Sequence, residues 1–474
     1  MNSPLAFGIK RGRARTAPAA HGQGGVTDAR GSLFVALMVW VLIVYLVVPA
    51  TYLRGETNLL ADAGTAAAAN PVGRTIKLTL LFFSTVIVLW RARLVWFVCR
   101  SINPFFVAFL ALVPLSVVWS IDPGATLARY VSLLSIVQVC LAFTLVAWNR
   151  TRFQDVVRPV VTALLIASVL WGLFYPEYGI EAGEKELKDA WRGLTTQKNQ
   201  FGMLASFGAV LWLHAWLNNE KKWWLALPLF GLSCVCVLLS RSSTSLLATA
   251  LCTLFMLLVM AAPANLRRYM PYIVSSFAVL VVIYALAILN LIPGISLLLE
   301  PIAALAGKDL TFSNRAVIWD IIKEHIQLAP FLGSGYGAYW TGPYPSSPSY
   351  AFLVRMFFYP SEAHNGYLEM VNDLGFIGLI CLLGYLVYWV RQSLELMKLD
   401  RGQGLLFLAL FFQQAITNLS ETTWLAINSA FAIVVMTLAM FSLARSLLEW
   451  RVLRHFRAPV AEPQRHAPPR RRFQ

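Results

Sequence analysis

Long apolar runs, separated by shorter polar connections, cover most of the chain. Twelve such runs lie near residues 33–53, 75–90, 102–119, 130–148, 157–174, 200–217, 223–239, 245–262, 271–292, 367–390, 404–418 and 426–446. A helix needs about 20 apolar residues to cross the hydrocarbon core of a bilayer. The pattern therefore predicts an all-α polytopic membrane protein with about 12 transmembrane helices.

The longest polar interval divides these runs into two groups. We expect a long periplasmic loop with amphipathic helices at 293–366, between transmembrane helices 1–9 at 33–292 and transmembrane helices 10–12 at 367–446. The two ends, 1–32 and 447–474, are basic and rich in Gly, Ala or Pro. This composition is typical of disordered tails, which we expect on the cytoplasmic side.

Composition excludes a soluble protein. With 58% hydrophobic and 13% charged residues, the chain has too little polar surface to cover a water-soluble fold. The six cysteines lie in or beside apolar runs, which favours core positions over disulfides or metal ligands. The net charge of +16 is spread over the connections and not gathered on one folded face, so we expect a lipid bilayer and no nucleic acid as partner.

The charges of the connections predict the orientation of the chain, because Lys and Arg accumulate on the cytoplasmic side. Every second connection is basic, with Arg91, Arg93, Arg100, Arg150, Arg152, Arg158, Lys221, Lys222, Arg267, Arg268, Arg391, Lys398 and Arg401. The connections between them contain few Lys and Arg, and residues 177–189 are acidic. We therefore expect a multi-pass protein of the bacterial inner (plasma) membrane with both termini in the cytoplasm.

Five ionisable residues are exceptions on the predicted outer side. They are Arg192 and Lys198 before the sixth run, Arg241 between the seventh and eighth runs, Arg315 in the long loop and His364 at its end. An arginine near a helix end can simply extend to lipid headgroups, and a lone interfacial histidine is often structural. Ionisable groups at the mouth of a membrane helix are, however, functional by default, and we expect these five to form one site.

The long loop contains its own predicted features. Ser313 is a candidate N-cap for an amphipathic helix in which Arg315 and Trp319 share one face. Tyr336 and Trp340 follow among several glycines. These two aromatic residues fit a sugar-stacking lip, although a plain loop can have the same composition.

The kinds of residue at this site favour one chemistry. The sequence has no nucleotide-binding loop, zinc motif or Asp-x-Asp pair, so we expect no metal and no cofactor. Arginine binds phosphate through two parallel hydrogen bonds and can neutralise a pyrophosphate leaving group. Histidine titrates near neutral pH and can accept the proton of an attacking hydroxyl. Together they predict glycosyl transfer from a lipid-linked pyrophosphoryl sugar.

Several stretches also carry a family pattern. They are Arg192-Gly193 with Gln197-Lys198-Asn199-x-x-Gly202, Ser240-Arg241-Ser242-Ser243-Thr244, Asn314-Arg315 with Trp319, Pro330 to Gly337, and His364-Asn365 followed by Gly375-x-x-Gly378. Through them the chain resembles the O-antigen ligase and polysaccharide polymerase superfamily, most closely its exopolysaccharide polymerase branch, over roughly residues 100–440. Gln197 departs from the pattern, because many relatives have histidine before Lys-Asn.

The resemblance implies a metal-independent, all-helical glycosyltransferase that acts on undecaprenyl-pyrophosphate-linked glycans at the periplasmic face. It implies that Arg192, Arg241 and Arg315 hold the pyrophosphate and that His364 activates the acceptor hydroxyl, with His364, Arg241 and Arg315 as the catalytic residues. The other residues that we expect at the substrate are Lys198, Asn199 and Asn365, with Tyr336 and Trp340.

Three alternatives for the function stay open at this point. The acceptor is either another lipid-linked repeat, as in a polymerase, which we favour, or lipid A-core, as in an O-antigen ligase. Chain-length-control and export proteins are candidate partners of such an enzyme. A secondary transporter is the alternative from another class, but the apolar runs contain almost no charged residues away from their ends.

Overall fold

A computed structural model describes residues 26–49, 71–147, 152–181, 189–262, 268–288, 315–427 and 430–457. Within these ranges the regular elements are helices, and the β-type pairing is limited to one isolated antiparallel bridge between Ile180 and Trp191. The all-α class is confirmed. Most of the two predicted tails and loop residues 289–314, including Ser313, lie outside the described ranges, so the predictions for them are untested.

Each of the twelve apolar runs contains helix. The helices are α1 (Val26–Val47), α4 (Pro71–Trp90), α5 (Ala92–Cys99), α6 (Pro104–Leu115), α7 (Pro123–Val146), α8 (Phe153–Phe174), α9 (Pro176–Gly179), α10 (Lys198–Leu217), α11 (Trp223–Leu239), α12 (Ser243–Ala261), α14 (Met270–Ile288), α16 (Arg315–Ile326), α17 (Tyr350–Met356), α18 (Gly366–Met397), α19 (Arg401–Thr417) and α20 (Ala430–Arg457). Among the described residues, eight helices are long and apolar enough to cross a membrane, or nine if the bent pair α5 and α6 forms one span. The count of twelve spans stays a prediction.

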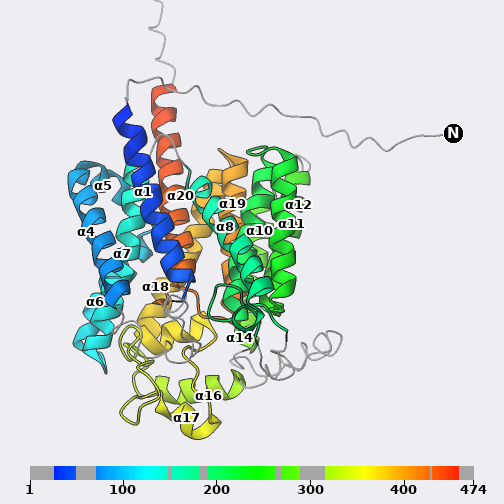
Figure 1. Ribbon diagram of the computed structural model, residues 1–474. Coiled ribbons are helices and arrows are strands. Elements are labelled where there is room, and N and C mark those ends of the chain that lie inside the picture. The colour runs from blue at the N-terminus through cyan, green and yellow to red at the C-terminus, as the bar shows by residue number, and fades with distance from the viewer. Residues whose placement is uncertain are drawn as a thin grey trace, which may run out of the picture.

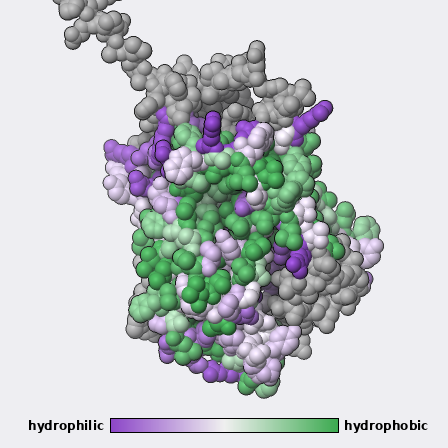
Figure 2. All heavy atoms as spheres, turned by 90° about the vertical axis from the view of Figure 1, so that its left-hand side faces the viewer, coloured by the Kyte–Doolittle hydropathy of each residue, from purple (hydrophilic) through white to green (hydrophobic). Residues whose placement is uncertain are grey.

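The long helices form a bundle that carries α16 and α17 at one end (Figure 1). The start of α1 and the end of α20 lie together at the opposite end. Figure 2 shows a broad band of hydrophobic side chains across the middle of one face, with hydrophilic residues above and below it. Such a band is what a bilayer requires, because lipid tails provide no hydrogen-bonding partner.

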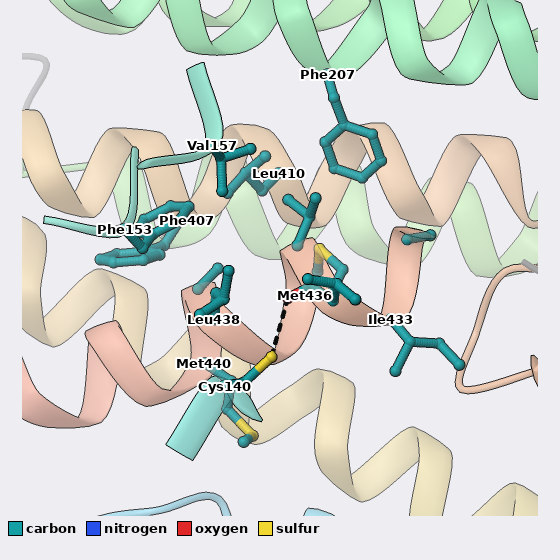
Figure 3. Packing of buried hydrophobic residues seen from close by; sticks show 14 of the residues in the cluster. Cys140, Phe153, Val157, Phe207, Phe407, Leu410, Ile433, Met436, Leu438 and Met440 are labelled. Carbon is teal, nitrogen blue, oxygen red and sulfur yellow. Dashed lines mark hydrogen bonds between the residues drawn. The ribbon is translucent and has the colours of Figure 1, made fainter. Parts of the chain in front are cut away.

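The core of the bundle lies around α10, α19 and α20. These helices and their neighbours α7 and α8 interdigitate through apolar side chains (Figure 3). Phe153 and Phe407 stack with ring centroids 5.8 Å apart, and the Cys140 thiol donates to the carbonyl of Val434 at 3.7 Å. Cys140, Cys236 and Cys252 are buried, as the sequence predicts, whereas Cys99 is exposed and does not occupy a core position.

The connections alternate between the two ends of the bundle. At the end that carries α16, the backbone amide of Ile121 donates to Ser334, and that of Trp191 donates to Leu239. At the other end, Arg152 pairs with Glu220 at 3.1 Å. The connections predicted to lie outside the membrane therefore gather at one end, and the basic connections at the other.

Helix α18 is broken near its start, and a loop fills the break. Gly375 has a φ of 63°, and a Cβ atom there would overlap the backbone of Phe331. The amides of Ser334 and Gly335 donate to the carbonyls of Asn372 and Asp373, at 3.0 and 2.9 Å. The glycine-rich stretch of the sequence therefore completes a broken helix and is not a free loop.

Candidate functional site

His364 lies two residues before the start of α18. The side chain of Asn365 caps this helix, because its oxygen accepts the amides of Tyr367 and Leu368 at 3.1 and 3.0 Å. His364 itself has a φ of 51°, a left-handed conformation that costs a non-glycine residue about 1–3 kcal/mol. The surrounding structure thus holds the backbone at His364 in a strained conformation.

Two carboxylates face the imidazole of His364. Its Nδ1 lies 3.2 Å from Glu362 Oε1 and 3.6 Å from Glu421 Oε2. Glu362 is buried beside the histidine, whereas Glu421 comes from the connection between α19 and α20. The His364 side chain is 18% exposed, so one edge of the ring remains accessible.

Glu421 joins His364 to two further parts of the chain. Its Oε1 accepts from Arg315 Nη2 and from Asn199 Nδ2, both at 2.8 Å. Arg315 begins α16, and Asn199 is the second residue of α10. We call these five residues, Asn199, Arg315, Glu362, His364 and Glu421, the His364 cluster; it brings together four segments that are distant in sequence.

Buried hydrogen bonds fix the backbone next to His364. Trp319 Nε1 donates to the carbonyl of Ala363 at 3.0 Å, and the amide of Ala363 donates to Glu369 Oε2 at 2.8 Å. Trp319 and Arg315 are four residues apart on α16, so one helix face contacts both the backbone of Ala363 and the carboxylate of Glu421. The predicted amphipathic helix is confirmed over Arg315–Ile326.

The cluster is ionic at neutral pH. Burial alone would lower the pKa of His364, but the carboxylates of Glu362 and Glu421 outweigh burial and raise this pKa to about 9. Burial alone would raise the pKa of Glu421, yet His364 and Arg315 hold it below its usual value. Two cationic and two anionic groups therefore neutralise one another.

The turn between α11 and α12 contains Arg241 and packs against the start of α10. Arg241 is exposed and has a φ of 49°. A Cβ atom at Gly202 would come within 2.7 Å of Ser240 Oγ, which explains why this position of α10 is glycine. Thr244 Oγ1 is hydrogen-bonded to Ser420 Oγ, and Ser420 directly precedes Glu421. This bond links the Arg241 turn to the His364 cluster.

Arg192 and Lys198 lie near the half-buried carboxylate of Glu181. Arg192 Nε donates to the carbonyl of Tyr178 at 2.7 Å, and the amide of Lys198 donates to Glu181 Oε1 at 2.7 Å. Burial raises the pKa of Glu181, and the positive charges of Lys198 and Arg192 oppose this shift. Because Trp191 also pairs with the end of α11, this loop adjoins the Arg241 turn.

Three residues expected at the substrate are buried instead. Tyr336 and Trp340 are each 2% exposed, and Asn365 is fully buried. Tyr336 donates to the carbonyl of Leu425 at 2.5 Å, and Trp340 donates to Glu369 Oε1 at 2.6 Å. Their polar atoms are used inside the protein, so the sugar-stacking lip is not supported; these side chains hold the loop and the helix start that carry His364.

Sequence reasoning missed the two carboxylates. Glu421 was not singled out; it lies in the short connection between the last two apolar runs, and its only signal is that it is an acid there. Glu362 is two residues from His364, but spacing alone does not tell whether such side chains meet. The contact appears only when α19 and α18 pack together.

Within the described residues, Glu362, His364 and Glu421 are the group whose ligand atoms lie close enough together to hold a metal ion, within 4.8 Å of one another. A metal would require neutral imidazole and free carboxylate oxygens. Arg315 and Asn199 already donate to Glu421 Oε1, whereas Glu421 Oε2 faces the imidazole. A metal ion here would therefore share Glu421 with Arg315 and Asn199.

Two comparisons with known proteins found matches to this chain. Residues 227–383 match the family model described as O-Antigen ligase. The chain is also 28% identical over 335 residues to the exopolysaccharide production protein ExoQ of Rhizobium meliloti (strain 1021), which covers 67% of this chain and 72% of that relative. The matched region includes the Arg241 turn, Arg315 and His364. The chain is therefore similar to the O-antigen ligase family over these residues, and its long apolar helices indicate a multi-pass membrane protein.

Proposed function

We propose that the protein is an inner-membrane glycosyltransferase that uses undecaprenyl-pyrophosphate-linked oligosaccharide as donor at the periplasmic face. Its reaction polymerises repeats in exopolysaccharide or O-antigen biosynthesis. The observation that carries this proposal is the His364 cluster, in which a histidine and an arginine from distant segments meet at one end of the bundle. The match to the O-antigen ligase model and the exopolysaccharide relative support a role in glycan assembly at the membrane.

In the proposed reaction, an acceptor hydroxyl attacks the anomeric carbon of the donor sugar. A C–O bond forms at that carbon, the C–O bond to the pyrophosphate breaks, and the hydroxyl proton passes to His364. Because Nδ1 faces Glu362 and Glu421, Nε2 is the nitrogen that takes this proton. Only the neutral imidazole can do so, and the carboxylates make it a strong base once it has lost its proton.

The arginines stabilise the departing pyrophosphate in this proposal. Negative charge develops on it as the bond breaks, and preorganised donors are most effective against developing charge. Arg315 is 22% exposed and uses Nη2 for Glu421, so it can face the donor while it stays in the cluster. Arg241 and Arg192 lie on the two loops that adjoin it.

Lipid-linked glycan profiling in cells tests this proposal. Deletion of a polymerase leaves single repeats on the carrier lipid, whereas loss of a ligase leaves long lipid-linked polymer that is not attached to lipid A-core. We expect the first result. Unchanged profiles would contradict the proposal and favour a transporter.

A further inference from the structure

A groove of about 410 Å³ runs between α11 and α12. Both helices pack on α10, and they separate from each other outside that contact. Phe230, Cys234 and Leu238 line the groove from α11, and Leu246, Ala250 and Leu257 line it from α12. Leu246 and Leu257 are eleven residues apart on α12. The groove therefore extends about 16 Å along this helix, roughly half of the thickness of the hydrocarbon core.

The groove suits a hydrocarbon chain in contact with lipid. Leu238, Leu246 and Leu254 are exposed along it, so it faces outward from the bundle and not into the core. The hydroxyl of Thr249, another lining residue, donates to the carbonyl of Ser245 at 2.7 Å, which satisfies this polar group inside the protein. The groove therefore offers an apolar surface in which a polar ligand would lose its hydrogen bonds.

One end of the groove is the Arg241 turn. Leu238 and Leu246 lie three residues before and five residues after Arg241, so the groove begins directly beneath it. The same turn is bonded through Thr244 to Ser420, next to Glu421 of the His364 cluster. The apolar groove thus leads to Arg241, and the Arg241 turn leads to the His364 cluster.

We propose that this groove binds the polyisoprenoid chain of the donor, with the pyrophosphate of the same molecule at Arg241. The proposal rests on the proposed function and assigns the part of the site that holds the lipid. A single chain ending in a diphosphate fits one groove that ends at an arginine. A diacyl phospholipid, with two chains and one phosphate, matches this geometry less well.

Donors with different tails test the groove in purified protein reconstituted into liposomes. The Ala250→Trp variant fills the groove, and Leu247→Trp is its matched control, because Leu247 is exposed on α12 outside the groove. The same glycan is supplied on undecaprenyl pyrophosphate and on a two-isoprene pyrophosphate. We expect Ala250→Trp to raise KM for the long donor about tenfold or more, with KM for the short donor unchanged, and Leu247→Trp to resemble the wild type.

The possible outcomes separate the two proposals. An unchanged KM of Ala250→Trp for the long donor, or an equal rise for both donors, overturns the groove assignment while the proposed function stands. If the wild type transfers glycan from neither donor, the proposed function fails, and the groove assignment fails with it.

A second measurement does not depend on how the variant folds. A diazirine-bearing polyprenyl pyrophosphate should label wild-type peptides from residues 230–257, and unlabelled polyprenyl pyrophosphate should compete where phosphatidylglycerol does not. Labelling confined to other helices, or equal competition by phosphatidylglycerol, overturns the assignment and identifies the occupant as ordinary lipid.

Discussion

The imidazole of His364 contacts two carboxylates, and they control its charge. With a pKa of about 9, His364 is protonated at pH 7 and becomes neutral as the pH rises through 9. A general base works in its neutral form, so we predict that activity rises with pH up to about 9. Glu421→Gln removes one of the two carboxylates that raise this pKa. The increase of activity with pH should therefore occur at lower pH in this variant. Glycosyl-transfer rates across pH measure both effects.

Glu324→Gln is the matched control for this change. Glu324 is an exposed glutamate that pairs with Arg355 at 2.8 Å, outside the His364 cluster, so its pH profile should equal that of the wild type. Activity that falls as pH rises from 7 to 9 would show that His364 acts as a cation or an acid and not as the base.

Arg241 provides a second test at the scale of single residues. Loss of one preorganised donor to developing charge costs about 3–4 kcal/mol, so Arg241→Ala should lower kcat about 10²–10³-fold. Arg241→Lys should recover only part of this loss, because lysine cannot form the two parallel hydrogen bonds of a guanidinium. Arg268→Ala, a change at an exposed arginine two residues before α14, is the control. Full activity of Arg241→Ala would remove Arg241 from the site.

At the scale of elements, the break in α18 determines where His364 points. The helix starts at Gly366, and loop amides complete its backbone hydrogen bonds around Gly375. Gly375→Ala places a Cβ atom against Phe331 at a φ of 63°. We predict at least about a tenfold loss of activity together with a lower thermal midpoint, because this backbone conformation is essentially restricted to glycine and costs another residue about 1–3 kcal/mol.

Gly231→Ala tests whether any added methyl group has this effect. Gly231 lies in α11, and a Cβ atom there meets no atom within 4 Å. This variant should keep its activity and gain up to about 1 kcal/mol of helix stability. If Gly375→Ala also keeps full activity, the break in α18 does not position His364.

Sequence periodicity predicts where the helices lie better than it predicts where a helix is broken. The apolar runs identify α10 and α12, because a helix that lies in a bilayer needs a long run of apolar residues. The role of residues 330–337 was not predictable, since the loop pairs with α18 nearly 40 residues later. For the same reason Tyr336 seemed to be an exposed aromatic residue, although it is buried against Leu425. Arg315 and His364 were singled out because ionisable residues are unexpected in the predicted outer connections, but the contact of each with Glu421 was not predictable.

At the scale of the whole molecule, the alternation of connections gives a test of topology. Lys222 and Arg241 lie at opposite ends of α11, and both are exposed. In a cysteine-free background, we predict that a membrane-impermeant maleimide labels Arg241→Cys in intact cells with a permeable outer membrane. It should label Lys222→Cys only after lysis. The reverse pattern would place the His364 cluster in the cytoplasm and contradict the proposed periplasmic reaction.

The measurement that tests the central claim most directly is glycan transfer by purified His364→Ala. Wild-type protein in liposomes, supplied with an undecaprenyl-pyrophosphate-linked repeat, should lengthen the glycan equally well with and without EDTA. His364→Ala, with the same thermal midpoint and expression, should be about 10²–10⁴-fold slower, because it lacks the general base. If this variant transfers glycan at close to the wild-type rate, or if EDTA stops the wild type, the account of a metal-independent histidine site is wrong.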